Sequence, residues 1–180
     1  MARACVLLAP GFEEIEAITI IDVLRRAEID TVTLAVKDNP VEGAHGIVVT
    51  ADASLDGAGD AWDAVILPGG MPGSTHLRDD ARVQALLKSQ HARGATVAAI
   101  CAAPIALAKA GVLVGRKATS YPGFQPQLEC DYRDETVVVD GNVVTSRGPG
   151  TAMAFALRLV ALLGSPKTAA LVGERMLVAP

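Results

Sequence analysis

The stretch ATVAAICAAPIALAKAG, residues 95–111, decides the fold of this protein. Its first part, Ala95–Ile100, is a short apolar run typical of a buried strand, and its second part, Ala102–Ala110, predicts a helix that Gly111 ends. Cys101 stands between them with no loop. A strand that turns directly into a helix, with small residues two positions to either side, predicts a nucleophile elbow. On this local pattern alone, an inert buried cysteine is the commoner explanation.

The same rhythm of short apolar runs and longer helical segments continues in both directions from this stretch. It predicts βαβ units, a mainly parallel sheet and helices on both faces, in a single domain over residues 1–180. The predicted strands are Arg3–Leu8, Thr31–Val36, Gly46–Ala51, Ala64–Leu67 and a hairpin over Thr136–Ser146 that turns at Asp140-Gly141. The predicted helices are Glu14–Arg26 (apolar at Ile15, Ile18 and Ile21), Asp80–Arg93, Thr151–Leu163 and Pro166–Met176.

The composition excludes several classes of protein. The 180 residues include 16 Lys and Arg against 20 Asp and Glu, a net charge of −4, which disfavours a nucleic-acid partner. The 51% of hydrophobic residues against 20% charged disfavours disorder. The apolar stretches are too short to span a membrane. Three cysteines imply no disulfide framework and favour a reducing, cytoplasmic location.

Ligands of parallel α/β sheets bind beyond the carboxyl ends of the strands, so the segments at those ends carry the candidate site residues. After the first strand come Glu13, Glu14 and Glu16, all suited to the positive end of a helix dipole. This role suffices for Glu13 and Glu14, which we expect to be solvated. Glu16 lies on another face of the helix, where it could point inward and shuttle protons beside a thiolate.

Two glycine-containing segments follow other predicted strands. Gly69-Gly70 is a tight turn whose bare N–H groups could also face a ligand oxygen. The segment Gly148-Pro149-Gly150-Thr151 predicts either a turn with Thr151 as helix N-cap, which we favour, or an anion cradle at a helix start. The helix N-terminus after Cys101 should lower the pKa of its thiol.

The remaining histidines and cysteines carry weaker signals. His45, His76 and His91 have no partner at metal-ligand spacing, so no metal site is predicted. We expect His91 to be solvated, Cys5 to be inert core, and Cys130 to be exposed beside acidic residues that raise the pKa of its thiol.

Taken together and in this order, these segments resemble the DJ/ThiJ/PfpI superfamily, in the branch of the Parkinsonism-associated protein deglycase and its bacterial relatives. The residues that carry the resemblance run along nearly the whole chain: Ala9-Pro10-Gly11-Phe12-Glu13-Glu14-Ile15-Glu16, Asp22-Val23-Leu24-Arg25-Arg26-Ala27, Asp52-Ala53-Ser54-Leu55, Leu67-Pro68-Gly69-Gly70, Ala99-Ile100-Cys101-Ala102-Ala103-Pro104 and Thr145-Ser146-Arg147-Gly148-Pro149-Gly150-Thr151.

The resemblance implies a flavodoxin-like three-layer α/β sandwich, a homodimer, and an oxidisable nucleophilic cysteine with a strained backbone at Cys101. It also implies a protonated glutamate at Glu16, hydrogen-bonded to that cysteine, and oxyanion N–H groups at Gly70 and Ala102. Candidate substrate-lining residues are Gly69, Arg26, His45, Tyr121 and Pro122.

The chain departs from the family pattern at three positions. Ala102 replaces the histidine that follows the cysteine in protease-like members, and Tyr121 replaces the histidine before Pro122 in deglycase-like members. No Cys–His dyad is therefore available, which disfavours a peptidase. His45 replaces a site arginine, which weakens an anion site there.

The function implied is a cofactor-independent glyoxalase III or protein deglycase. Its partners would be methylglyoxal, glyoxal or glycated protein, and it would need no metal or organic cofactor. Cys101 would be the nucleophile, and Glu16 the general acid and base. The alternative is an oxidative-stress sensor or redox-regulated chaperone that uses the same cysteine with little turnover.

Overall fold

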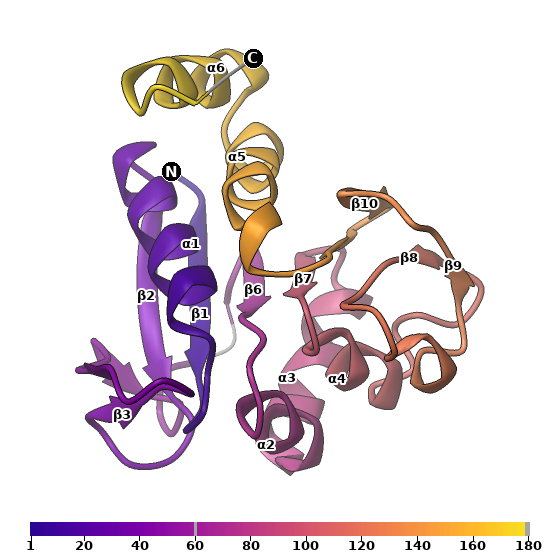
Figure 1. The fold of residues 1–180 in the computed structure, drawn as a ribbon. Helices are drawn as coiled ribbons and strands as arrows, with labels where there is room; N and C mark the ends of the chain where they lie inside the picture. The colour runs from indigo at the N-terminus through magenta and orange to yellow at the C-terminus, as the bar shows by residue number, and fades with distance from the viewer. Residues whose placement is uncertain (60, 179–180) are drawn as a thin grey trace.

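The computed structural model describes residues 1–59 and 61–178. Within them, the main sheet has seven strands in the order β10-β11-β7-β6-β1-β2-β5 (Figure 1). Every neighbouring pair is parallel except β10 and β11. Its strands are β1 (Arg3–Leu8), β2 (Asp30–Ala35), β5 (Ala53–Ser54), β6 (Ala64–Leu67), β7 (Thr96–Ile100), β10 (Val137–Asp140) and β11 (Val143–Ser146).

Alternate residues of β1 enter two separate cores, which makes the fold a three-layer sandwich. Ala4, Val6 and Leu8 pack with helices α1 and α5, and Cys5 and Leu7 pack with α3 and α4. The helices are α1 (Glu14–Arg26), α2 (Gly73–Asp79), α3 (Ala81–Ala92), α4 (Pro104–Lys109), α5 (Ala152–Leu163) and α6 (Pro166–Arg175), with short 3₁₀ turns at Gln125–Gln127 and Pro149–Thr151. In Figure 1, α6 continues beyond α5 at the C-terminal end.

Two small sheets lie outside the main one. Strands β3 (Val41–Glu42) and β4 (Val48–Val49) form an antiparallel pair, and β8 (Lys117–Ala118) and β9 (Asp131–Tyr132) a parallel pair. The strand predicted at Gly46–Ala51 is therefore reduced to β4 and belongs to the first small sheet.

The five principal parallel strands, taken in chain order, are arranged 2-1-3-4-5, which is the flavodoxin-like order. The order in which the chain adds strands to the sheet reverses between β1 and β6: β2 lies on one side of β1, and β6, β7 and β11 lie on the other. In such a sheet, ligands bind beyond the carboxyl ends of the strands on either side of this reversal. The segments after β1, β6 and β7 therefore meet at one edge.

The structure corrects several local predictions. The hairpin turns at Gly141-Asn142, not Asp140-Gly141, because Asp140 pairs with Val143, and Gly141 takes a φ of 60°. Helix α2 was not predicted, since its sequence GSTHLRD lacks a helical apolar pattern. Helix α4 begins only at Pro104, after a turn over residues 101–103.

Helix α1 buries only part of the face that the isoleucine spacing suggested, namely Ile21. Ile15 and Ile18 are 59% and 45% exposed, whereas Glu16, Ile20 and Leu24, which follow one another at i, i+4, are fully buried. This rotation places a carboxylate on the core-facing stripe.

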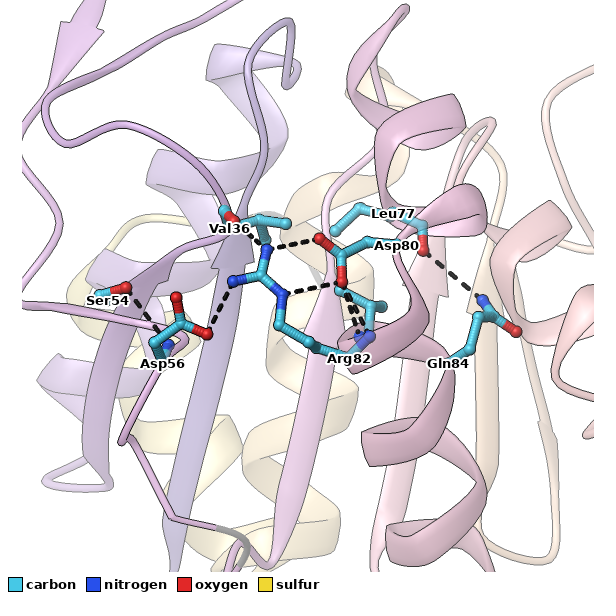
Figure 2. A network of polar contacts seen from close by, with 8 residues as sticks. Val36, Ser54, Asp56, Leu77, Asp80, Arg82 and Gln84 are labelled. Atoms are coloured by element: carbon cyan, nitrogen blue, oxygen red, sulfur yellow. Dashed lines mark hydrogen bonds and ion pairs between the residues drawn. The ribbon is translucent and has the colours of Figure 1, made fainter.

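Helix α3 is tied to the sheet edge by a polar network around Arg82 (Figure 2). Asp80 caps the helix by accepting from the N–H groups of Arg82 and Val83. The Arg82 guanidinium donates to the Val36 carbonyl at 2.6 Å and pairs with Asp56 at 2.8 Å.

No helix among the described residues is long and apolar enough to cross a membrane.

Candidate active site

Cys101 occupies the turn between β7 and α4 with a φ of 63°, a left-handed conformation that is strained for a residue with a side chain. This confirms the expected backbone strain. The Cys101 N–H donates to the Ser146 carbonyl at 3.0 Å, and its own carbonyl accepts from the Tyr121 N–H at 2.8 Å. Two segments distant in sequence therefore hold the elbow. Cys101 itself is only 9% exposed.

Backbone N–H groups surround the thiol where the resemblance placed them. The N–H groups of Gly70 and Ala102 both donate toward the Cys101 sulfur, which lowers the pKa of the thiol. Gly70 has a φ of 90°, and a Cβ there would lie 2.3 Å from the backbone nitrogen of Glu13. Only glycine can therefore aim this N–H at the sulfur.

Glu16 is completely buried beside the thiol. Its Oε2 accepts from the Gly69 N–H at 2.7 Å. Its Oε1 is buried with no hydrogen-bond partner of ordinary geometry among the described residues, although the thiol is near enough for each group to shift the other's pKa. Burial raises the pKa of Glu16 to about 7, against the opposing effect of the Gly69 N–H.

The close approach of these groups depends on Gly69. A Cβ on this residue would lie 2.5 Å from the Cys101 Cβ and 2.7 Å from the Glu16 Oε2. Because Gly69 has no side chain, the Glu16 carboxylate and the Cys101 side chain can both lie close against its backbone.

The expectation that the pKa of the Cys101 thiol is lowered overall is wrong, although the Ala102 N–H at the helix start does act in that direction. Burial raises the pKa to about 12, and the charge and hydrogen bond of ionised Glu16 add to this. The N–H groups of Gly70 and Ala102 oppose this only in part. Because an ionised carboxylate disfavours a thiolate beside it, the pair retains one proton over a wide pH range.

Glu13 and Glu14 are also buried, which corrects their predicted solvation. Glu13 caps helix α1 by accepting from the Ile15 N–H. Glu14 accepts from the His45 N–H at 2.6 Å and contacts the His45 Nδ1 at 2.8 Å. This contact raises the pKa of His45 and fastens the 43–47 loop to α1. In this cluster, atoms of Glu13, Glu14 and His45 that could bind a metal lie within 4.8 Å of one another, but hydrogen bonds within the protein already engage them.

Three of the five candidate substrate-lining residues occupy quite different places. Gly69 lies between the thiol and Glu16. Tyr121 is anchored to Cys101 by its backbone while its side chain is 48% exposed. The structure does not bring Arg26 to the site, because it lies ten residues after Glu16, about 15 Å along α1, in an exposed ion pair with Asp22.

Thr151 is the N-cap residue of α5, as expected, but its side chain accepts no hydrogen bond from the N–H groups of that helix. Its hydroxyl instead accepts from the N–H groups of Arg147 and Gly148 and lies 2.7 Å from the Ser146 hydroxyl. It therefore stiffens the strand end that holds Cys101. The sequence reasoning noticed this segment but missed Ser146 and Arg147, since nothing local to them signals contact with an elbow 45 residues away.

Three other local expectations can be compared with the structure. Cys5 is fully buried, as expected, and burial raises the pKa of its thiol. Cys130 is only partly exposed, and the pKa of its thiol is raised by burial and by Asp131. His91 is half-buried rather than solvated, and its Nδ1 has no hydrogen-bond partner among the described residues.

Comparisons with known proteins agree with this fold. Residues 2–162 match the model of the DJ-1/PfpI family. Protein dj-1beta of Drosophila melanogaster is 45% identical over 98% of this chain and 97% of its own length. A Caenorhabditis elegans protein named glutathione-independent glyoxalase DJR-1.2 is 37% identical over 91% of this chain and 90% of its own.

Among solved structures, that of Toxoplasma gondii DJ-1, described as oxidized, has a TM-score of 0.96 and 38% identity and covers all of both chains. A match over most of the chain, relatives above 30% identity and the cysteine elbow of the α/β sandwich lead to one conclusion: this chain belongs to the DJ-1/PfpI family.

Proposed function

We propose that this protein is a cofactor-independent glyoxalase that converts methylglyoxal into lactate and glyoxal into glycolate. The observation that carries the proposal is the grouping of the Cys101 thiol, the buried Glu16 carboxyl and two N–H donors around one sulfur. The relative named as a glutathione-independent glyoxalase supports it.

The reaction begins when the Cys101 thiolate adds to the aldehyde carbon and forms a hemithioacetal. The N–H groups of Gly70 and Ala102 stabilise the negative charge that develops on the aldehyde oxygen. Because they are backbone groups at a rigid turn, they need no rearrangement as the charge develops.

Glu16 then moves a proton from the former aldehyde carbon to the neighbouring carbon through an enediol. A pKa of about 7 suits a group that must both accept and donate a proton near neutral pH. The product is a thioester of 2-hydroxy acid and Cys101, which water hydrolyses. The aldehyde carbon is oxidised, the ketone carbon is reduced, and water supplies the added oxygen, so no external oxidant or reductant enters the balance.

Release of early dicarbonyl adducts from protein side chains would use the same addition chemistry, with the amine as leaving group. Tyr121, half-exposed at the edge of the site, replaces the family histidine and supplies a phenol in place of an imidazole. In this proposal, Tyr121 orients the substrate and Glu16 carries out the proton transfers.

A second candidate function is oxidation sensing through Cys101, with a regulatory or chaperone-like output. The N–H donors that would hold an oxyanion would equally hold the oxygens of a sulfinate. The related Toxoplasma gondii structure is described as oxidized. This function predicts selective oxidation of Cys101 and little aldehyde turnover.

We also propose that the protein acts as a homodimer in the cytoplasm. Four aliphatic side chains are about half exposed around the first turns of α1: Ile15, Ile18, Ile47 and Val48. Ile47 adjoins α1 because its N–H bonds to Glu14. Contiguous exposed aliphatic groups of this kind are typical of a protein interface.

The deciding experiment is lactate formation from methylglyoxal, followed by NMR. We expect turnover by the wild type, its loss in Cys101→Ser and Glu16→Gln, and its retention in Cys130→Ser, which controls for removal of a thiol elsewhere. A fully reduced wild type without turnover would contradict the glyoxalase proposal. Peroxide titration with intact-mass readout would then test the sensor, with Cys101→Ser expected to abolish the first oxidation.

A further inference from the structure

A cavity of about 310 Å³ lies beside the elbow. Its walls come from two segments on either side of Cys101: residues 121–122, and residues 147–151 with Thr136. Methylglyoxal has five heavy atoms, far fewer than would fill this space. The glyoxalase chemistry proposed above leaves the cavity without a role.

The two walls of the cavity are fastened to the Cys101 backbone by hydrogen bonds, although Cys101 itself does not line the cavity. Tyr121, on one wall, donates its N–H to the Cys101 carbonyl, and Ser146, directly before Arg147 on the other wall, accepts from the Cys101 N–H. Each wall is thus one hydrogen bond from the residue that bears the nucleophile.

Contacts within the protein hold the walls in place. The Tyr121 ring packs against Gly148, where a Cβ would lie 3.2 Å from the ring. The Thr151 hydroxyl binds the N–H groups of both Arg147 and Gly148, at 3.2 and 3.1 Å. A site held in this way loses little conformational entropy when a ligand enters.

The chemistry of the walls is apolar with one cation. Tyr121, Pro122 and Pro149 supply apolar surface, and Arg147 supplies a guanidinium whose side chain is 32% exposed. Arg147 pairs with Asp134, whose side chain is 71% exposed. An exposed ion pair of this kind is weak, so a ligand carboxylate can replace Asp134 at little cost.

We propose that this cavity is a specificity subsite for 2-oxoaldehydes whose far end carries a carboxylate, with Arg147 binding that carboxylate and Tyr121 and Pro149 packing on the intervening carbons. The proposal rests on the proposed glyoxalase function, because it places the reacting aldehyde at Cys101. It adds a substrate class, namely oxoaldehydes longer than methylglyoxal that bear an anionic end.

The test compares two substrates of equal length. 4,5-Dioxopentanoate carries a terminal carboxylate, and 2-oxopentanal has a methyl group in its place. Their products would be 2-hydroxyglutarate and 2-hydroxypentanoate, each formed by addition of one water, and NMR distinguishes both. We expect kcat/KM to favour 4,5-dioxopentanoate by about tenfold, mainly through KM, the size of one charge-assisted hydrogen bond.

Three variants separate this subsite from general charge effects. Arg147→Gln should bring the ratio of the two kcat/KM values close to one. Asp134→Asn, which removes the competing carboxylate, should raise it. Arg158→Gln makes the same change of net charge at an exposed position of α5 outside the cavity and should leave the ratio unchanged.

The outcomes distinguish this inference from the function on which it rests. Turnover of methylglyoxal with a ratio near one in the wild type would overturn the subsite and leave the glyoxalase intact. If no oxoaldehyde is turned over, the glyoxalase proposal fails and binding decides the subsite. In that case 4-oxopentanoate should shift the Tyr121 and Gly148 amide signals at lower concentration than 2-pentanone, and equal shifts would overturn the proposal.

Discussion

At the level of single residues, the proposed chemistry of this protein centres on one proton shared by Glu16 and Cys101. Burial raises the pKa of both groups, and each ionised form disfavours the other. Of the states available near neutral pH, a thiolate beside a neutral carboxyl is the one in which Cys101 can attack a carbonyl. The Oε1 of Glu16, buried and without a hydrogen-bond partner among the described residues, is the atom that is free to carry that proton.

The raised pKa of Glu16 predicts a pH dependence of stability. Between about pH 4.5 and 7, the unfolded chain has released this proton and the folded protein retains it, so the free energy of unfolding falls as pH rises. The shift corresponds to about 3 kcal/mol at 1.36 kcal/mol per pKa unit. Glu16→Gln should remove this decline. Urea denaturation at several pH values measures it, and equal slopes in both proteins would contradict the assignment.

The same pair predicts the pH dependence of thiol reactivity. The pair loses its first proton near pH 7, and the minor form that keeps the other proton on Glu16, with Cys101 as thiolate, reaches its full population above that pH. Alkylation of Cys101 by iodoacetamide should therefore rise through about pH 7 and then level off. Peptide mapping follows each cysteine separately, and Cys130 serves as the internal control. An inflection of Cys101 only at the alkaline pH of an ordinary thiol would show that the two groups do not share a proton.

Gly69→Ala should abolish turnover and destabilise the protein by about 1–3 kcal/mol. The added methyl group would fall within 2.7 Å of both the Cys101 Cβ and the Glu16 Oε2, which must then move apart. Gly57→Ala is a matched control, since nothing lies within 4 Å of its Cβ position, although its positive φ adds strain. Assays of turnover and of thermal unfolding on both variants test this, and an active Gly69→Ala would contradict the close packing described here.

At the level of elements, helix α3 shows how one residue can serve both a helix and the sheet. Asp80 caps α3 and also pairs with Arg82, whose guanidinium reaches the carbonyl of Val36 after β2 (Figure 2). The ion pair holds the pKa of Asp80 below its usual value. Because Arg82 also pairs with Asp56 after β5, one network holds the start of α3, the end of β2 and the loop after β5.

Asp80→Ala should cost about 1 kcal/mol of stability through the lost cap, and more if Arg82 also releases the Val36 carbonyl. Asp80→Asn keeps an acceptor for the helix N–H groups and should cost less. Asp79→Asn, at a neighbouring exposed aspartate paired with Arg78, should have an effect within about 0.5 kcal/mol. Chemical denaturation measures all three, and an Asp80→Ala variant as stable as Asp79→Asn would contradict the role of the cap.

At the level of the whole molecule, the orientation of α1 about its axis buries Glu16 and leaves Ile15 and Ile18 exposed. The helix therefore carries Glu16 of the proposed reaction centre on one face and presents aliphatic groups on the other. An interface on this outer face would lie beside the His45 loop, which Glu14 fastens to the same helix.

This arrangement predicts that Ile18→Glu dissociates the homodimer, because it places a charge in the centre of the exposed aliphatic group. Leu171→Glu, the same kind of change at a 43% exposed leucine on α6, should leave the dimer intact. Light scattering after size exclusion measures the mass of each. A wild type with the mass of one chain would refute the dimer, and an Ile18→Glu variant that remains dimeric would place the interface elsewhere.

The sequence by itself was enough to predict the α/β class, most strands and helices, and the elbow at Cys101. These features rest on local signals, namely apolar runs, helical spacing and small residues around one cysteine. The residues alone also made Glu16 and Gly69-Gly70 candidates, and the family resemblance added Ala102 and assigned roles to Glu16 and Gly70. Helix α2, the shift of the hairpin turn by one residue and the late start of α4 escaped prediction because propensities in short segments yield to their tertiary surroundings.

Only the tertiary structure decided what surrounds the cysteine. Glu16, Gly69, Cys101 and Ser146 are far apart in the chain and meet because the sheet order places the ends of β1, β6, β7 and β11 together. Burial is the main reason why the pKa values of Glu16 and Cys101 are raised, and no local sequence pattern reports how deeply either side chain is buried. The same fold leaves Arg26 remote from the site within the chain and places Tyr121 and Arg147 on the walls of one cavity.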